Sequence, residues 1–120
     1  MNTHKDPKEI ARALCRRSDL RSFQHGAVLF DGHGVFAWGW SNFRSKRSNE
    51  FRTLCAERHA LQRANKRRLG GALLVVAGIR RKSGTLILSK PCALCEKAIR
   101  EAGIKTVIFS DQEVWRQVSF

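Results

Sequence analysis

Apolar positions along the chain recur with a helical period in three stretches. The segment 6–20 repeats apolar residues every three to four positions, and it opens with a capping residue, Asp6, followed by Pro7. Segments 55–69 and 92–102 have the same period, and each is followed by glycine. The pattern therefore predicts three helices. The residues that they are expected to bury are Ile10, Ala13, Leu14, Ala56, Ala60, Leu61, Ala64, Leu94, Ala98, Ile99 and Ala102.

Runs rich in β-branched and aromatic residues predict the strands. Segments 26–30 and 34–40 flank a turn sequence, Asp-Gly-His-Gly, and predict a hairpin. Segment 72–79 is apolar throughout, as in a strand that is covered on both faces. Segment 106–109 follows the third helix, as a parallel neighbour reached by a crossover connection would.

Two segments have a less regular pattern of apolar residues, so their secondary structure is predicted from fewer positions. Segment 41–52 is polar and has no regular period, which predicts a loop that leads into the second helix. Segment 112–120 places Val114, Trp115 and Val118 at helical spacing, which predicts a short helix. With 120 residues and no repeat or linker, the chain is expected to form a single domain, 1–120, of mixed α/β structure.

The chemistry-bearing residues lie at the starts of the second and third helices. Cys92 and Cys95 are two residues apart, so one helix turn can direct both sulfurs to one ion. Cys55 from the other helix would complete three corners of a tetrahedral zinc site and leave the fourth corner to water. Zinc lowers the pKa of such a water to about 7. Glu57, two residues from a ligand, is placed to take up the proton.

A closed structural zinc site is the alternative. His59, four residues after Cys55, lies on the same helix face and is the nearby candidate for a fourth protein ligand. The remaining cysteine, Cys15, is expected to be a buried small apolar residue.

Charge and cysteine usage bear on partners and compartment. The 23 Lys and Arg residues against 10 Asp and Glu give a net charge of +13, more than one nucleotide phosphate requires. A polyanionic partner is one interpretation and a solvated basic surface is the other. Three cysteines at ligand spacing favour a reducing, cytoplasmic compartment over disulfides. The longest apolar run, 72–79, is too short to span a membrane.

Segment 41–52 also interleaves aromatic and cationic residues. This combination suits bases that stack while a phosphate backbone is neutralised, although the aromatic residues could equally pack on the domain. The residues concerned are Phe43, Arg44, Lys46, Arg47, Phe51 and Arg52.

The order of elements, with Cys-Ala-Glu on one helix and Pro-Cys-x-x-Cys on the next, resembles the cytidine and deoxycytidylate deaminase superfamily over residues 7–110. The resemblance implies a three-layer α/β/α cytidine deaminase-like fold, with a mixed five-stranded sheet and helices on both faces, and a homo-oligomer. It also implies Zn²⁺ on Cys55, Cys92 and Cys95, with Glu57 as proton shuttle. The backbone of Ala56 would help to hold the base.

The hairpin region is also similar to tRNA adenosine deaminases, in which an Asn directly after Gly-Trp contacts the sugar. Here Ser41 holds that place, and Asn42, which follows it, is the candidate sugar contact. The all-cysteine ligand set is similar to that of free-cytidine deaminases, in which a Glu binds ribose hydroxyls; here Phe43 and Arg44 stand near its place. Lys90, before the Pro-Cys motif, could meet a 5′-phosphate together with Arg44 or Arg52, and a solvated lysine is the alternative interpretation. The candidate substrate contacts are thus Ala56, Ser41, Asn42, Phe43, Arg44 and Lys90.

Three functions follow from these features. The first is hydrolytic deamination of cytosine to uracil in a (deoxy)cytidine nucleoside or nucleotide, with dCMP-like substrates favoured by the cationic loop. The second is deamination of cytosine, or less readily adenine, within single-stranded DNA or RNA. The third is a non-catalytic zinc module that binds nucleic acid. Glu57 argues against the third, because a structural zinc site has no use for a carboxylate beside an open position.

Overall fold

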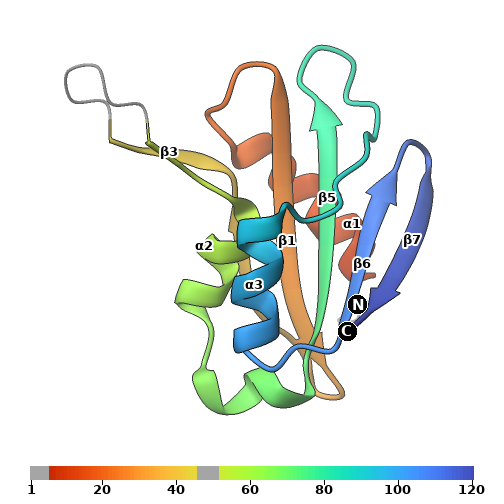
Figure 1. Ribbon diagram of the computed structural model, residues 1–120. Helices are drawn as coiled ribbons and strands as arrows, with labels where there is room; N and C mark the ends of the chain where they lie inside the picture. Colours follow the sequence, from red (N-terminus) through yellow and green to blue (C-terminus); the bar gives the residue numbers. More distant parts are fainter. Residues whose placement is uncertain (1–5, 46–51) are drawn as a thin grey trace.

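A five-stranded sheet forms the middle layer of the molecule (Figure 1). The computed structural model of the chain describes residues 6–45 and 52–120. The strands follow the order β2-β1-β5-β6-β7; β5 and β6 are parallel and the other neighbours are antiparallel. The strands are β1 (Phe23–Asp31), β2 (Gly34–Trp40), β5 (Leu73–Arg80), β6 (Thr106–Asp111) and β7 (Val114–Ser119). The mixed five-stranded sheet that the resemblance implies is confirmed.

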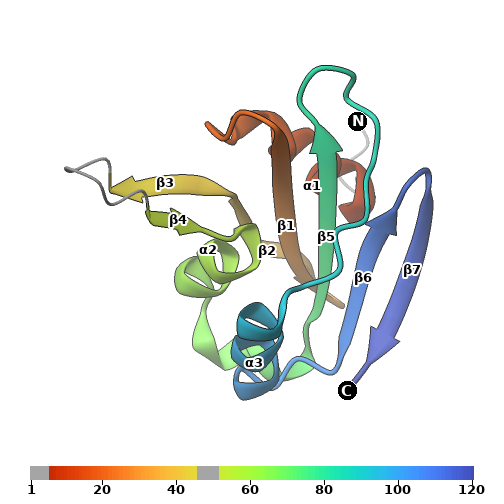
Figure 2. The ribbon, with the colours of Figure 1, turned by 45° about the horizontal axis from the view of Figure 1, so that its top comes forward.

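Helices cover both faces of this sheet, which completes the expected three layers (Figure 2). Helix α1 (Pro7–Leu14) lies on one face, over Val28, Val75 and Ala77. Helices α2 (Ala56–Arg63) and α3 (Ala93–Glu101) lie side by side on the other face. Strand β5 is buried on both sides, as its apolar sequence predicts. The predicted metal-ligating cysteines, Cys55, Cys92 and Cys95, belong to the face that α2 and α3 cover.

Helix α1 begins as predicted but ends early. The Asp6 carboxylate accepts the N–H of Lys8 at 2.9 Å. The helix ends at Leu14 and continues as a single 3₁₀ turn, η1 (Cys15–Arg17), because Ser18 is extended and its hydroxyl accepts the N–H of Leu20. Ala11, not Ala13, faces the core.

Helix α2 is also shorter than the predicted 55–69. It ends at Arg63 because Ala64 is extended, and Asn65 then caps a separate 3₁₀ helix, η2 (Lys66–Gly71), by accepting the N–H of Arg67. The glycines that were expected to end α2 lie in η2. The four residues predicted to bury on this face, Ala56, Ala60, Leu61 and Ala64, are all buried.

Helix α3 has the predicted extent but a different first turn. Leu94 is 58% exposed, contrary to the prediction, whereas Cys95 and Ile99 are fully buried. The helix turns Cys95 toward α2, and this rotation moves the preceding residue out to solvent.

The segment predicted as a loop, 41–52, contains part of a second, two-stranded sheet. Strand β3 (Asn42–Ser45) pairs with β4 (Arg52–Leu54) in antiparallel register, Asn42 opposite Leu54 and Phe43 opposite Thr53. This ribbon extends away from the main sheet beside α2 (Figure 2). Its polar residues give no apolar alternation, which is why the pattern did not reveal it. Lys46, Arg47 and Phe51 lie outside the described residues.

The C-terminal segment forms strand β7 and not the predicted helix. Gln112 adopts a left-handed conformation (φ 56°) and closes a turn after β6, so the chain returns along the open edge of β6. Trp115 packs with the core on the α1 side and Val118 with the core on the other side, as strand residues an odd number apart do. Within 6–45 and 52–120, no helix is both long and apolar enough to cross a lipid bilayer.

Candidate active site

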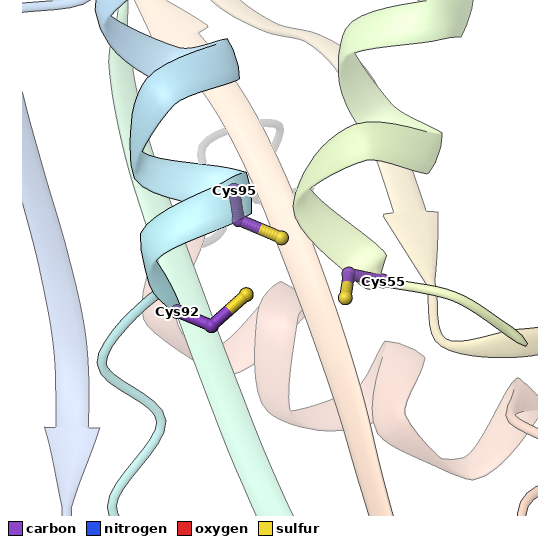
Figure 3. Close-up of side chains that lie close together, drawn as sticks. All are labelled: Cys55, Cys92 and Cys95. Carbon is purple, nitrogen blue, oxygen red and sulfur yellow. The ribbon is translucent and has the colours of Figure 1, made fainter.

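Three cysteine sulfurs from two helix starts converge on one point (Figure 3). Cys55 is the N-cap of α2, Cys92 is the N-cap of α3, and Cys95 lies in the first turn of α3. Their Sγ atoms lie within 4.8 Å of one another, and none of the three forms a disulfide. Both helix starts point their free N–H groups toward this end of the molecule, which favours thiolates there.

Close backbone packing fixes the position of α2. A Cβ added at Gly39 of β2 would lie 2.5 Å from the N of Ala60 and 2.7 Å from the O of Ala56. Only a residue without a side chain lets α2 approach β2 this closely. Cys55 and Glu57 therefore take their places from a direct contact between helix and strand.

Two buried hydroxyls fix the segment that leads into α3. The Ser89 and Ser110 Oγ atoms lie 2.8 Å apart, and the N–H of Ser89 donates to the O of Ser110 at 2.8 Å. The Ser110 hydroxyl also donates to the O of Ile87 at 2.7 Å. These bonds hold the chain against β5 and β6 directly before Lys90 and Cys92.

Arg58 is a neighbour of the sulfurs that the sequence analysis missed. Its Nη2 donates to the Sγ of Cys55 at 3.8 Å. Hydrogen bonds from Cys95 and Arg58 lower the pKa of the Cys55 thiol to about 5. The spacing of three residues from Cys55 places both side chains on one helix face, a signal that the sequence did contain.

Glu57 lies deep beside the sulfurs. It is 6% exposed, and burial, together with the negative charge of Cys55, raises the pKa of its carboxyl group to about 7. A carboxyl group that titrates near neutrality can both accept and release a proton during a reaction.

His59 is not one of the converging donors. Its Nδ1 accepts the N–H of Trp40 at 3.1 Å, and its ring packs edge-on against Trp40 at 4.7 Å between centroids. Across the ranges that the structure describes, the group of metal-ligating atoms at this site consists of the three sulfurs. The alternative of a closed site with His59 as fourth ligand therefore finds no support.

The donor set suits zinc. Ligands at the usual Zn–S distance of about 2.3 Å in a tetrahedron are about 3.8 Å apart. The three sulfurs, all within 4.8 Å of one another, are near enough for one ion to contact them all. Cys15, by contrast, is buried away from the site, where its thiol donates to the carbonyls of Ala11 and Ala77, and burial raises its pKa to about 12. It is a core residue, as expected.

A pocket of about 210 Å³ opens beside the sulfurs and Glu57. This volume is below the range of about 300–1,000 Å³ for drug-sized ligands, as suits a site for one heterocycle and its sugar. Its lining residues come from β1, β4, the starts of α2 and α3, and the segments before them: Leu20, His25, Ser41, Thr53, Leu54, Cys55, Ala56, Glu57, Ser89, Lys90 and Cys92.

Some of the predicted substrate contacts line this pocket and others do not. Ala56, Ser41 and Lys90 line it. Asn42 and Phe43 are not among the lining residues, and the Asn42 amide donates to the O of Trp40 at 2.7 Å. Arg44 belongs to β3, but its side chain lies outside the described part of the chain. His25 and Thr53 line the pocket without having been predicted to bind substrate. His25 is distant from Cys55 in the sequence, whereas Thr53 lies two residues before it in the segment that was predicted as a loop.

The chain matches a known family over nearly its whole length. The family model for the cytidine and deoxycytidylate deaminase zinc-binding region matches residues 1–111. No curated protein sequence matches the chain.

Solved structures share its fold. The chain is similar to the cytidine deaminase from Burkholderia pseudomallei, with a TM-score of 0.69 and 24% identity over 98% of this chain and 93% of that chain. It is similar to the dCMP deaminase from the cyanophage S-TIM5 in apo form, with a TM-score of 0.64 and 22% identity over 88% of this chain and 79% of that chain. The cytidine deaminase from Mycobacterium leprae gives a TM-score of 0.59 and 19% identity over 92% and 88%. Together with the family match and the three sulfurs, this places the chain in the cytidine and deoxycytidylate deaminase family of zinc-dependent hydrolytic enzymes, with zinc as the cofactor.

Proposed function

We propose that the chain deaminates cytosine to uracil, with release of ammonia, in a (deoxy)cytidine nucleoside or nucleotide, and that dCMP-like substrates are favoured. The observation that carries this proposal is a buried carboxyl group, Glu57, beside three converging sulfurs in one pocket. We assign the zinc ion to Cys55, Cys92 and Cys95.

The residues of the pocket have different roles in the proposed reaction. Bound zinc supplies a Lewis acid that makes water acidic enough to attack at neutral pH. Glu57 accepts the proton of the water that attacks C4 of the ring. It delivers this proton to N3, then takes the second proton from the hydroxyl now on C4 and passes it to the amine as the C4–N bond breaks, so that water is consumed and ammonia is released. The backbone of Ala56 contacts the base, and Arg58 offsets part of the negative charge of the thiolates.

The preference for a phosphorylated substrate rests on Lys90. It lines the pocket and is exposed to solvent, as a group at the mouth of a site would be. An ammonium there would meet a 5′-phosphate once the base lies beside Glu57. Arg44 from the β3–β4 ribbon is the second cation that we assign to this role.

A substrate panel tests the proposed function. The zinc-loaded protein would be incubated with deoxycytidine, dCMP and a single-stranded oligonucleotide, and uracil would be measured in each. We expect turnover of the two small molecules, with a lower KM for dCMP. Turnover of the oligonucleotide alone would reject the proposal in favour of nucleic-acid editing.

Glu57→Ala separates catalysis from metal binding. We expect this variant to keep about one zinc per chain and to lose roughly 10²- to 10⁴-fold in kcat, since it lacks the proton shuttle. Zinc content by atomic absorption and uracil formation give the two readouts. Loss of zinc together with activity would show that Glu57 holds the structure, as in a non-catalytic zinc module.

Editing of single-stranded nucleic acid is the second candidate, and a surface beside the pocket favours it. Trp38 and Trp40 lie on the edge strand β2, directly before the pocket residue Ser41. The guanidinium of Arg63 lies 5.2 Å from the Trp38 ring centre and that of Arg17 5.2 Å from the Trp40 ring centre. Aromatic rings with cations suit a single strand. Oligonucleotide binding that does not weaken with salt would count against this surface.

The proposal extends to assembly and compartment. We infer a homo-oligomer, for which Leu88 and Leu94, 57% and 58% exposed, offer apolar surface on either side of Cys92 in the sequence. Light scattering that gives the monomer mass at working concentration would contradict it. A reducing, cytoplasmic compartment agrees with thiols that must stay unoxidised to bind zinc.

A further inference from the structure

His25 lines the pocket, and the sheet leaves room for its ring. It sits on β1 directly opposite Gly78 of β5. A Cβ added at Gly78 would lie 2.8 Å from Cδ2 and 2.9 Å from Nε2 of the imidazole. The ring therefore occupies the space that a side chain at position 78 would take, and the absence of that side chain lets the ring lie against β5 while it lines the pocket.

The polar atoms of this ring are available to a ligand. The hydrogen bonds of His25 use its backbone: its N–H donates to Ser41 Oγ at 3.0 Å, and its O accepts the N–H of Ser41 at 3.0 Å. No group within the described ranges hydrogen-bonds the ring. Burial lowers the pKa of His25, so the ring is neutral at pH 7 and offers one donor and one acceptor.

The lining residues differ in exposure: Glu57 is nearly buried, His25 is half-buried and Lys90 is exposed. With the base of a nucleotide beside Glu57 and its phosphate beside Lys90, the sugar spans the pocket that His25 also lines. Ser41, which holds the place of the Asn that contacts the sugar in tRNA adenosine deaminases, has its hydroxyl engaged by Ser18 Oγ at 2.9 Å and by the N–H of His25.

We propose that the imidazole of His25 hydrogen-bonds a sugar hydroxyl of the substrate, which makes His25 a specificity-determining residue. This inference rests on the proposed function, because it needs a cytosine nucleoside in the pocket. It assigns the discrimination between a nucleoside and the free base to a residue of the sheet and not to the β3–β4 ribbon.

His25→Phe tests the proposal, because it keeps a flat ring of similar size and removes both nitrogens. One neutral hydrogen bond corresponds to roughly a 3- to 10-fold change in affinity. We expect KM for deoxycytidine to rise by about that factor with kcat little changed, whereas kcat/KM for free cytosine stays at the wild-type value. His33→Phe, the same substitution at the exposed hairpin tip, is the matched control. It should leave the kinetic constants for both deoxycytidine and cytosine at their wild-type values.

A binding measurement separates this inference from the proposed function. Calorimetry with the Glu57→Gln variant, with and without His25→Phe, gives Kd for deoxycytidine and cytosine without turnover. Equal weakening of both ligands, or of neither, would overturn the role of His25 even if the wild-type enzyme is active. If the wild-type protein deaminates no cytosine compound, the proposed function fails, and the two Kd values still decide the sugar contact.

A second variant changes the surroundings of the His25 imidazole from the neighbouring strand, β5. Gly78→Ala places a methyl group against the imidazole and should shift it from its place in the pocket. The expected result is again weaker binding of deoxycytidine than of cytosine, relative to wild type. Should His25→Phe fail to fold, Gly78→Ala and His25→Val allow the same comparison. If the ratio of Kd for deoxycytidine to Kd for cytosine stays at the wild-type value in both variants, the proposal is refuted.

Discussion

At the scale of single residues, Arg58 shows how the charge of the site is balanced. Three thiolates around one Zn²⁺ leave a net negative charge, which opposes the acidification of a nearby water. The Arg58 guanidinium, partly buried and 3.8 Å from the Cys55 sulfur, offsets that charge. Its pKa is raised above the ordinary value by the hydrogen bond to Cys55, so the cation persists at every working pH.

Arg58→Ala should therefore impair the site without unfolding the protein. Substitution of an outer-shell partner usually costs about 10- to 100-fold in metal affinity or activity. We expect a loss of that size in kcat or in zinc affinity, measured by uracil formation and by competition with a chelator. Arg67→Ala, at an exposed position on η2, is the control. Wild-type values of both quantities in Arg58→Ala would refute the charge-balancing role.

The residues of the site differ in how far the sequence reveals them. Cys55, Cys92 and Cys95 could be proposed from spacing, because each belongs to a helix start that local sequence defines. His25 could not, since its position matters only through Gly78, which β1 and β5 bring opposite it. Ser41 was proposed from its place after Gly-Trp, but its hydroxyl is engaged by Ser18 and His25 in a network that no local pattern specifies.

At the scale of elements, the contact between β2 and α2 sets the geometry of half the site. The backbone of α2 lies against Gly39, and Cys55 and Glu57 occupy the start of the same helix. Any side chain at position 39 must push the helix away from the strand. The precision of the site thus depends on a residue that contributes no chemistry.

Gly39→Ala should destabilise the fold by about 1–3 kcal/mol and also weaken zinc binding, because the displaced helix moves Cys55 from the two sulfurs of α3. Chemical denaturation gives the free energy of unfolding, and chelator competition gives the zinc affinity. Gly32→Ala, in the hairpin turn with no atom within 4 Å of the added methyl group, is the matched control. If both variants behave alike, the close approach at Gly39 does not position the site.

The elements that the sequence predicted well are those whose signals are local. The cap at Asp6, the inward face of α2 and the apolar β5 were all predictable from neighbouring residues. Strand β7 was not, because its Val114, Trp115 and Val118 fit a helix as well as a strand until the open edge of β6 is considered. The β3–β4 ribbon was missed for a related reason: its pairing, and not its composition, makes it a strand pair.

At the scale of the whole molecule, a zinc ion on the three cysteines, as we propose, would tie together the starts of two helices that are far apart in the sequence. Helices α2 and α3 are neighbours on one face, yet β5 separates them in sequence. An ion bound to both helix starts stabilises the native state only, since the unfolded chain does not present the three sulfurs together.

Removal of zinc should therefore lower Tm. A ligand present at about a thousand times its Kd stabilises the folded state by about 4 kcal/mol, which corresponds to a fall of roughly 10 °C or more when it is removed. Differential scanning calorimetry before and after chelation measures this shift. Cys55→Ser provides the comparison, because its Tm should respond less to the chelator. An equal Tm with and without metal would mean that zinc does not brace the two helices.

The division of the three sulfurs between one helix turn and a distant helix start has a kinetic consequence. Cys92 and Cys95 form a local chelate as soon as the first turn of α3 exists, whereas Cys55 reaches them only after β5 has joined the sheet and α2 has docked. With zinc on these three sulfurs, as we propose, a nascent chain would capture its metal in two stages, loosely and then firmly. Firm retention of zinc would then mark the completion of folding.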